Sequence, residues 1–121
     1  MSEEVKKWLK KAEKDLLAAK INLQQELYDV SSFLSHQAAE KALKALYILK
    51  FKRLWKTHDL VGLLVKLNSE EDLLEICDEL NRHYIDTRYP SEAEYTETVA
   101  EDAIKNSKKV VEWVKKKLEK N

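Results

Sequence analysis

The amino-acid sequence predicts an all-α protein, an up-and-down bundle of four to five helices. Apolar residues recur every three or four positions along most of the 121-residue chain, which is the period of an amphipathic helix. The chain has one glycine and one proline, and no alternating pattern typical of a strand is visible. Short connections between long amphipathic helices favour antiparallel neighbours. We therefore expect residues 1–121 to form a single helical domain.

The first two predicted helices are long. The first is expected to begin at Ser2 and to end near residues 25–27, with apolar residues on one face. The second is expected from residue 29 or 31 to about Arg53. It is apolar on more than one side, so we expect it to be central and packed on both sides.

A short helix and a fourth helix are expected next. Thr57 is a candidate N-cap for a short helix over residues 58–67. That helix contains the only glycine, Gly62, where close approach of another backbone would explain a residue of low helix propensity. Ser69, followed by three acidic residues, predicts the start of a fourth helix that ends near His83.

The segment of residues 84–90 separates the fourth helix from the last one. It holds the only proline, Pro90, so a helix must stop at or before Tyr89. We expect non-helical backbone here, either as a connector whose tyrosines cover the core or as a site built on a loop. The last helix is expected to begin between residues 91 and 98 and to continue to about Leu118.

Net charge is zero, but it is distributed unevenly. The net charge is −1 over residues 1–40, +6 over residues 41–66, −10 over residues 70–102 and +5 over residues 105–121. A protein that binds nucleic acid through bulk positive charge would not show this balance. A molecule with one basic and one acidic surface would show it, and so would solvated helix faces that cluster by chance.

Polar side chains are unusually dense on the predicted central helix. They recur at spacings of three and four residues, at His36, Gln37, Glu40, Lys41 and Lys44. The stripe is either an ion-paired surface or a polar seam that faces a partner or a ligand phosphate. His36 and Glu40 could supply two metal ligands, but no third His or Cys is near them in sequence. We therefore expect neither a metal site nor a cofactor.

Arg88 is the charged residue of the proline segment with the clearest chemical use. A guanidinium group can bind a carboxylate or a phosphate through two parallel hydrogen bonds. Asp86 is the alternative partner within the same segment. Asp59, which follows His58, is placed to cap a helix. No glycine-rich phosphate loop, serine nucleophile motif or pair of catalytic carboxylates occurs at a recognisable spacing.

The sequence also predicts a cellular location. Its one cysteine, Cys77, allows no internal disulfide, which fits a reducing cytosol. The N-terminal residues lack the apolar region of a signal peptide, and no apolar run approaches the roughly 20 residues that span a bilayer. We expect a cytoplasmic protein that does not enter a membrane.

Three motifs resemble those of the HEPN domain family (higher eukaryotes and prokaryotes nucleotide-binding). Residues 33–46 resemble its signature helix, residues 57–60 its short Ser/Thr-His-Asp-Leu element, and residues 86–90 its Arg-Tyr-Pro segment. The resemblance implies a four- to five-helix bundle that pairs as a homodimer. It also implies a minimal nucleotidyltransferase as partner, in a two-component system of the toxin–antitoxin kind.

The same resemblance bears on catalysis. In many HEPN proteins an arginine, separated by four to six residues from a histidine, cleaves RNA without a metal, and the two copies meet at the dimer interface. In the toxin pairs, a tyrosine just beyond that histidine can be adenylylated by the partner. Here no histidine follows Arg82 or Arg88 at that distance, so the general acid or base is missing from the place expected after these two arginines. The positions are Ala93, Glu94 and Tyr95 after Arg88, and Thr87, Arg88 and Tyr89 after Arg82.

Three hypotheses follow. In the first, a non-catalytic cleft binds a nucleotide or an RNA phosphate, or docks the nucleotidyltransferase. In the second, a divergent ribonuclease uses Arg88 with His58 or Tyr95. In the third, the protein is a scaffold dimer without ligand. The missing histidine favours binding over cleavage. The candidate ligand-binding residues are His36, Gln37, Glu40, Lys44, His58, Asp86, Arg88 and Tyr89.

Overall fold

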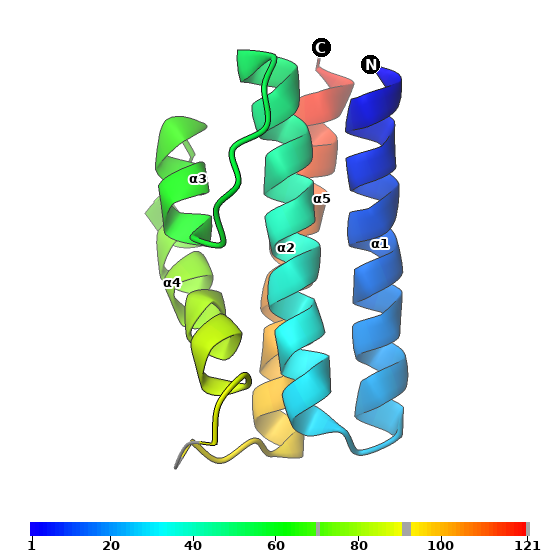
Figure 1. Ribbon diagram of the computed structural model, residues 1–121, viewed down its shortest axis with the longest axis vertical. Coiled ribbons are helices and arrows are strands. Elements are labelled where there is room, and N and C mark those ends of the chain that lie inside the picture. Colours follow the sequence, from blue (N-terminus) through cyan, green and yellow to red (C-terminus); the bar gives the residue numbers. More distant parts are fainter. Residues whose placement is uncertain (70, 91–92, 121) are drawn as a thin grey trace.

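The computed structural model describes residues 1–69, 71–90 and 93–120. In these residues the chain forms five helices and no strand, which confirms the predicted all-α bundle (Figure 1). No helix of the described residues is both long and apolar enough to span a membrane. The helices are α1 (Glu3–Gln24), α2 (Tyr28–Phe51), α3 (Leu60–Lys66), α4 (Glu71–Asp86) and α5 (Glu97–Glu119).

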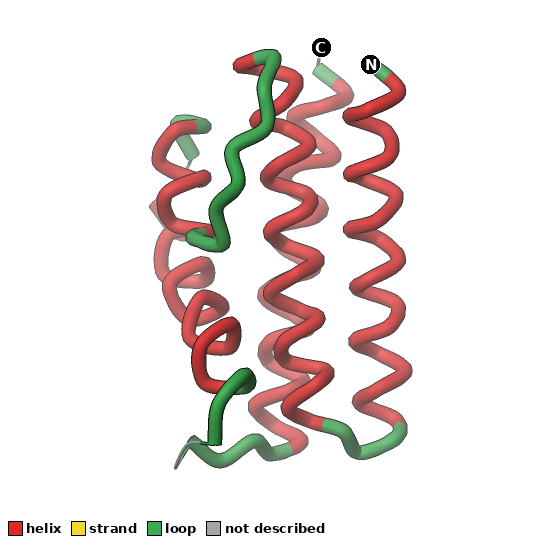
Figure 2. The backbone as a smooth tube through the Cα atoms, in the orientation of Figure 1, coloured by secondary structure: helices red, strands yellow, loops and turns green. Residues whose placement is uncertain are grey.

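Helix α2 is central, as its apolar faces predict. It contacts all four other helices, whereas α1 contacts neither α3 nor α4. Helices α1, α2 and α5 run lengthwise through the bundle, and α3 and α4 lie on the other side of α2 from α1 (Figure 1). Both termini lie at the end of the bundle where α2 finishes. A long loop then returns from that end to the start of α3 (Figure 2).

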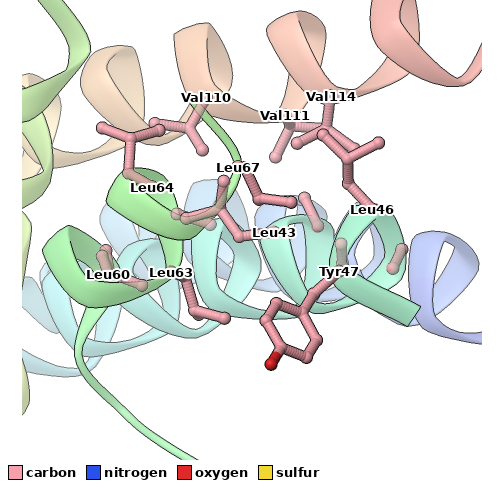
Figure 3. Packing of buried hydrophobic residues seen from close by; sticks show 14 of the residues in the cluster. Leu43, Leu46, Tyr47, Leu60, Leu63, Leu64, Leu67, Val110, Val111 and Val114 are labelled. Carbon is pink, nitrogen blue, oxygen red and sulfur yellow. The ribbon is translucent and has the colours of Figure 1, made fainter. Parts of the chain in front are cut away.

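The core is mostly aliphatic and contains residues of all five helices. Leucines of α2 and α3 meet valines of α5, and Tyr47 lies at the edge with its hydroxyl directed away from them (Figure 3). Alanines 38, 39, 42 and 45 of α2 are fully buried. Their small side chains let α1 and α5 approach closely, and the Oγ of Ser31 donates to the carbonyl of Ala19 in α1 at 2.7 Å. Burial on several faces fixes α2 as the scaffold for any site built on it.

The helix starts follow capping chemistry. Ser2 and Thr96 accept hydrogen bonds from the backbone N–H groups three residues on, so the expected starts of α1 and α5 are confirmed. The predicted cap at Thr57 is wrong. Asp59 caps α3 by accepting from the N–H of Val61, and Thr57 Oγ1 accepts from the N–H of Asp59 instead. Both side chains could cap, and the structure uses the one next to the first helical residue.

Helix α4 is longer than predicted. It runs to Asp86 rather than His83, so residues 84–86 are helical and not part of a loop. The reason is that Pro90 restricts only itself and the residue before it, which leaves one further turn available. Helix α2 begins at Tyr28, before the predicted start, and ends at Phe51, before the predicted end, because Lys52 takes a left-handed conformation with φ of 60°. The predicted cap at Ser69 depends on residue 70, which lies outside the described residues.

Gly62 lies where a side chain would collide with two others. A Cβ atom built there would lie 2.9 Å from Asp59 Oδ2 and 3.3 Å from Trp55 Cη2. The close approach comes from these two side chains and not, as expected, from another backbone. The glycine therefore lets the loop before α3 pack directly onto the helix.

Candidate functional site

The polar stripe of α2 is a buried seam rather than an ion-paired surface. His36 is completely buried, and Glu40 and Lys44 are 3% and 5% exposed. Lys44 Nζ donates to Glu40 Oε2 at 3.1 Å, so the two charges compensate each other inside the protein. Gln37 is half-buried and forms no hydrogen bond with this seam among the described residues. Lys41 instead pairs with Asp15 of α1.

His58 connects this seam to solvent. Its Nδ1 lies 2.8 Å from Glu40 Oε1, while its side chain is 53% exposed. A carboxylate only accepts hydrogen bonds, so Nδ1 carries the proton and donates it to Glu40. In the neutral ring Nε2 then holds a lone pair. A buried carboxylate that fixes the tautomer of a histidine is the arrangement that orients a general base.

His36 holds the backbone of His58 through a hydrogen bond. Its Nε2 donates to the carbonyl oxygen of His58 at 2.9 Å. Burial lowers the pKa of His36 to about 4, although Glu40, the His58 carbonyl and the Asn81 side chain act in the opposite direction. His36 is therefore neutral at physiological pH. Its Nδ1 is buried and has no hydrogen-bond partner among the described residues.

Asn81 of α4 fixes the same loop from the other side. Its Oδ1 accepts from the N–H of Leu60 at 2.9 Å, and its Nδ2 donates to Asp59 Oδ1 at 2.9 Å. His36 and Asn81 thus hold the backbone at His58 and at Leu60. A ring held in this way loses little further entropy on binding a ligand.

Tyr84 brings the two exposed cation-forming side chains together. The His58 ring stacks on the Tyr84 ring at 4.4 Å between centroids and 17° between planes. The guanidinium carbon of Arg88 lies 4.7 Å from the same Tyr84 ring, one helical turn later in sequence. The sum of the two distances, about 9 Å, is therefore the upper limit for the separation of His58 and Arg88.

A small hollow lies beside Arg88. It has a volume of about 240 Å³ and is lined by Asp29, Val30, Phe33, Thr87 and Arg88. Phe33 also stacks at 6.1 Å on Tyr84, so the hollow adjoins the stacked rings. The ring of Tyr89 is 62% exposed and lies 5.7 Å from the Arg88 guanidinium.

Tyr95 belongs to a different pair. Its hydroxyl lies 3.0 Å from Nδ1 of the buried His83, and burial raises the pKa of Tyr95 to about 12. Burial also lowers the pKa of His83, although the nearby Asp86, the last residue of α4, opposes this change. No hydrogen bond or ring contact joins Tyr95 to His58 or Arg88 among the described residues. Tyr95 keeps its proton and is a poor candidate for a base.

The structure brings together four of the predicted site residues: His36, Glu40, Lys44 and His58. Arg88 joins them through Tyr84, which belongs to the segment of residues 84–90 but was not named as a site residue. Tyr84 lies in the last turn of α4, and Arg88 follows the end of that helix. Asn81 and His83 were missed as well. Asn81 has no motif around it, and its role depends on α3 packing against α4.

Comparisons with known proteins give the family. The model of the HEPN domain matches residues 5–117. A curated protein of Methanocaldococcus jannaschii named "Putative toxin MJ1304" is 30% identical over 129 aligned positions, which cover 91% of this chain and 85% of that protein.

Solved structures agree with this match. TT1696 from Thermus thermophilus has a TM-score of 0.87 and 28% identity, with 96% of this chain and 99% of that chain covered. An archaeal HEPN homologue, ST0689, has a TM-score of 0.83 and 31% identity, with 96% and 98% covered. A HEPN domain protein from Thermotoga maritima has a TM-score of 0.79 and 25% identity, with 94% and 98% covered. The chain therefore belongs to the HEPN domain family.

Proposed function

We propose that this HEPN-domain protein acts in a toxin–antitoxin-like pair and binds a phosphate group of RNA or of a nucleotide at His58, Tyr84 and Arg88. The similarity to a protein named as a toxin supports the first part. The stacked side chains support the second. The expected partner, a minimal nucleotidyltransferase, follows from the family resemblance and is part of the proposal.

One observation carries the phosphate site: Arg88 and His58 are both held against Tyr84. A phosphate group that accepts hydrogen bonds on two sides spans a gap of several ångströms, which the limit of about 9 Å allows. Arg88 offers paired N–H donors to phosphate oxygens. His58 offers either a lone pair or, when protonated, a second cationic donor from Nε2. The hollow beside Arg88 leaves room for part of the ligand.

Isothermal titration with ATP, GTP and a short RNA tests this site. We expect binding by the wild type and a loss of affinity of about tenfold or more in Arg88→Ala, since hydrogen bonds to charged groups contribute about 1.5–3 kcal/mol. Arg82→Ala is the matched control, because Arg82 is an exposed arginine of α4, six residues before Arg88, and it pairs with Asp78 at 3.4 Å. No heat with any ligand, or equal losses in both variants, would remove the phosphate site.

RNA cleavage without a metal is the second candidate function. The hydrogen bond between Glu40 and His58 favours it, because it leaves Nε2 of an exposed histidine free to take a proton. In such a step, Nε2 accepts the 2′-hydroxyl proton and the 2′-oxygen bonds to phosphorus. The bond to the 5′-oxygen breaks, water supplies a proton to that oxygen, and Arg88 stabilises the charge on the phosphate.

Incubation of tRNA and mRNA with EDTA tests this candidate. We expect His58→Ala and Arg88→Ala each to lower the cleavage rate by about 100-fold, since a positioned general base contributes about 10²–10⁴, while Arg82→Ala retains it. Glu40→Gln should lower the rate less, because a side chain of the same shape stays in place. Cleavage that survives in His58→Ala and Arg88→Ala would come from a contaminating nuclease and would leave only the binding function.

A further inference from the structure

We propose that the loop of residues 52–59 is a track for single-stranded RNA that leads to His58. This inference rests on the proposed phosphate site and extends it, because it selects a polynucleotide rather than a free nucleotide as the ligand. The loop begins at the end of the bundle that holds both termini and descends along it to the start of α3 (Figure 2). His58 lies at its far end, next to the Asp59 cap.

The loop and the end of α2 before it are basic. The chain as a whole has equal numbers of acidic and basic residues, yet residues 50–58 contain four cations and no acid. The cations are Lys50, Lys52, Arg53 and Lys56, and all of them are exposed. None of these four forms an ion pair among the described residues, whereas other lysines of the protein do. Cations without acidic partners attract a phosphate backbone and release its counterions.

A hollow lies part of the way along the loop. It has a volume of about 330 Å³ and is lined by Tyr47, Arg53, Leu54, Trp55 and Lys66. It therefore combines two cations with two aromatic rings and contains no acid. Aromatic rings beside cations form the stacking platforms on which bases of single strands rest.

The aromatic ring of the loop is held in place by residues of α2 and α3. The Trp55 ring lies 5.7 Å from the Tyr47 ring of α2. Its edge also lies against Gly62 of α3, where a Cβ atom would come within 3.3 Å of it. The indole is only partly buried, so part of it remains available to a base. A fixed, partly exposed ring binds with little loss of side-chain entropy.

A short RNA strand is long enough to contact several groups of the loop at once. Arg53 and His58 are five positions apart in the sequence, so their Cα atoms lie at most about 18 Å apart. Single-strand sites begin at about four nucleotides, and a strand of that size can contact Arg53, Lys56 and the His58 site together. A mononucleotide carries one base and one phosphate, so it cannot contact all of these groups at once. The structure thus predicts that affinity rises with oligonucleotide length.

Fluorescence anisotropy with labelled oligouridylates of 2, 4, 8 and 12 nucleotides tests the track, and titration with UMP tests the His58 site alone. We expect affinity to rise at least fivefold between 2 and 8 nucleotides. The double variant Arg53→Ala with Lys56→Ala should weaken the 8-mer at least fivefold and reduce the slope of log K against log[KCl] by about 1.4, because each lost contact with a single strand removes about 0.7. Its UMP affinity should not change.

The matched control is Lys14→Ala with Lys20→Ala, which removes two exposed lysines from α1. Helix α1 contacts neither α3 nor α4, so this control should bind as the wild type does. UMP binding with no dependence on length, or equal effects of the two double variants, would overturn the track and leave the phosphate site. Failure of UMP and of every oligonucleotide to bind would overturn both.

Discussion

At the scale of single residues, the site depends on two buried ionisable side chains, Glu40 and His36. Glu40 is almost completely buried, and its two oxygens serve different partners, Lys44 and His58. Lys44 compensates the negative charge of Glu40, and His58 is the exposed side chain that Glu40 orients. His36 does the opposite, because burial keeps it uncharged and leaves it one role, a hydrogen bond to the His58 backbone. A substitution at Glu40 therefore affects both folding and the site.

The first prediction concerns His36 and acid stability. Its pKa is about 4 when folded and about 6.5 when unfolded. Between these pH values the unfolded chain binds a proton that the folded protein does not, so the free energy of unfolding falls as the pH is lowered through this window. The contribution is at most about 1.4 kcal/mol per pH unit. Urea unfolding of the wild type and of His36→Gln between pH 7 and 4 measures it.

His83 provides a second buried histidine with which the effect of His36 on acid stability can be compared. Burial also lowers the pKa of His83, so His83→Gln should flatten the pH dependence in the same direction. His36→Gln is expected to lower the free energy of unfolding at pH 7, because the hydrogen bond from His36 to the His58 carbonyl is disturbed. Below pH 6.5, its free energy of unfolding should change less with pH than that of the wild type. Identical slopes in the wild type and in His36→Gln would contradict the assignment of a neutral, buried His36.

At the scale of elements, the short helix α3 shows that the cap of a helix depends on side chains from other elements. Its position was predicted from apolar spacing, and both Thr57 and Asp59 were named as caps; the structure uses Asp59. Asp59 is fixed by Asn81 of α4, 22 residues away, which no local pattern reveals. The end of α4 was misplaced for a similar reason, because a proline sets only an upper limit for a helix.

The second prediction concerns the glycine of α3. Gly62→Ala would raise stability by about 1 kcal/mol through helix propensity alone. Its Cβ, however, would lie 2.9 Å from Asp59 Oδ2, and the same carboxylate caps Val61 and binds Asn81 through Oδ1. We therefore expect Gly62→Ala to lower the free energy of unfolding by about 1 kcal/mol, a typical cost of a disturbed cap, as measured by urea titration.

A double-mutant cycle separates the two contributions. Asp59→Ser keeps a capping oxygen but removes the second carboxylate oxygen, so Gly62→Ala should be neutral or stabilising in that background. A Gly62→Ala variant that is more stable than the wild type, or equally destabilised in both backgrounds, would show that the contact with Asp59 does not limit this position.

At the scale of the whole molecule, one helix provides both the core and the site. The periodicity of apolar residues alone predicted the bundle and the central place of α2, because a helix that is buried on several faces has apolar residues on each of them. Glu40, His58 and Arg88 were each identified from their chemistry or from a family motif. Their assembly through Tyr84 was not, because the contacts join α2, the loop before α3 and the end of α4, and sequence spacing does not encode distances between elements.

The third prediction concerns association. The family resemblance implies a homodimer in which the two sites meet. The three tryptophans are partly buried against the core and offer little support, but Ile85 and Tyr89 on either side of Arg88 are 61% and 62% exposed. These two side chains flank Arg88 in the sequence, where the resemblance places the dimer interface. By analytical ultracentrifugation we expect a dimer that Ile85→Glu weakens at least tenfold.

Leu17→Glu is the control for this prediction. Leu17 lies on α1 and is 57% exposed, so the same change is made at a position of similar exposure on a helix that does not touch α4. The dimer should persist in Leu17→Glu. A concentration-independent monomer mass for the wild type, or equal weakening by both substitutions, would remove the expected interface.

The most direct test of the phosphate site observes His58 itself. Long-range ¹H–¹⁵N spectra of the three histidine rings report the tautomer and the surroundings of each nitrogen. Without ligand, His58 should be protonated at Nδ1, as its hydrogen bond to Glu40 requires. Addition of a short RNA or a nucleotide should shift Nε2 of His58, leave His83 unchanged and have no effect on His58 in Arg88→Ala. A ligand that saturates the protein without moving the His58 signals would contradict a site at His58, Tyr84 and Arg88.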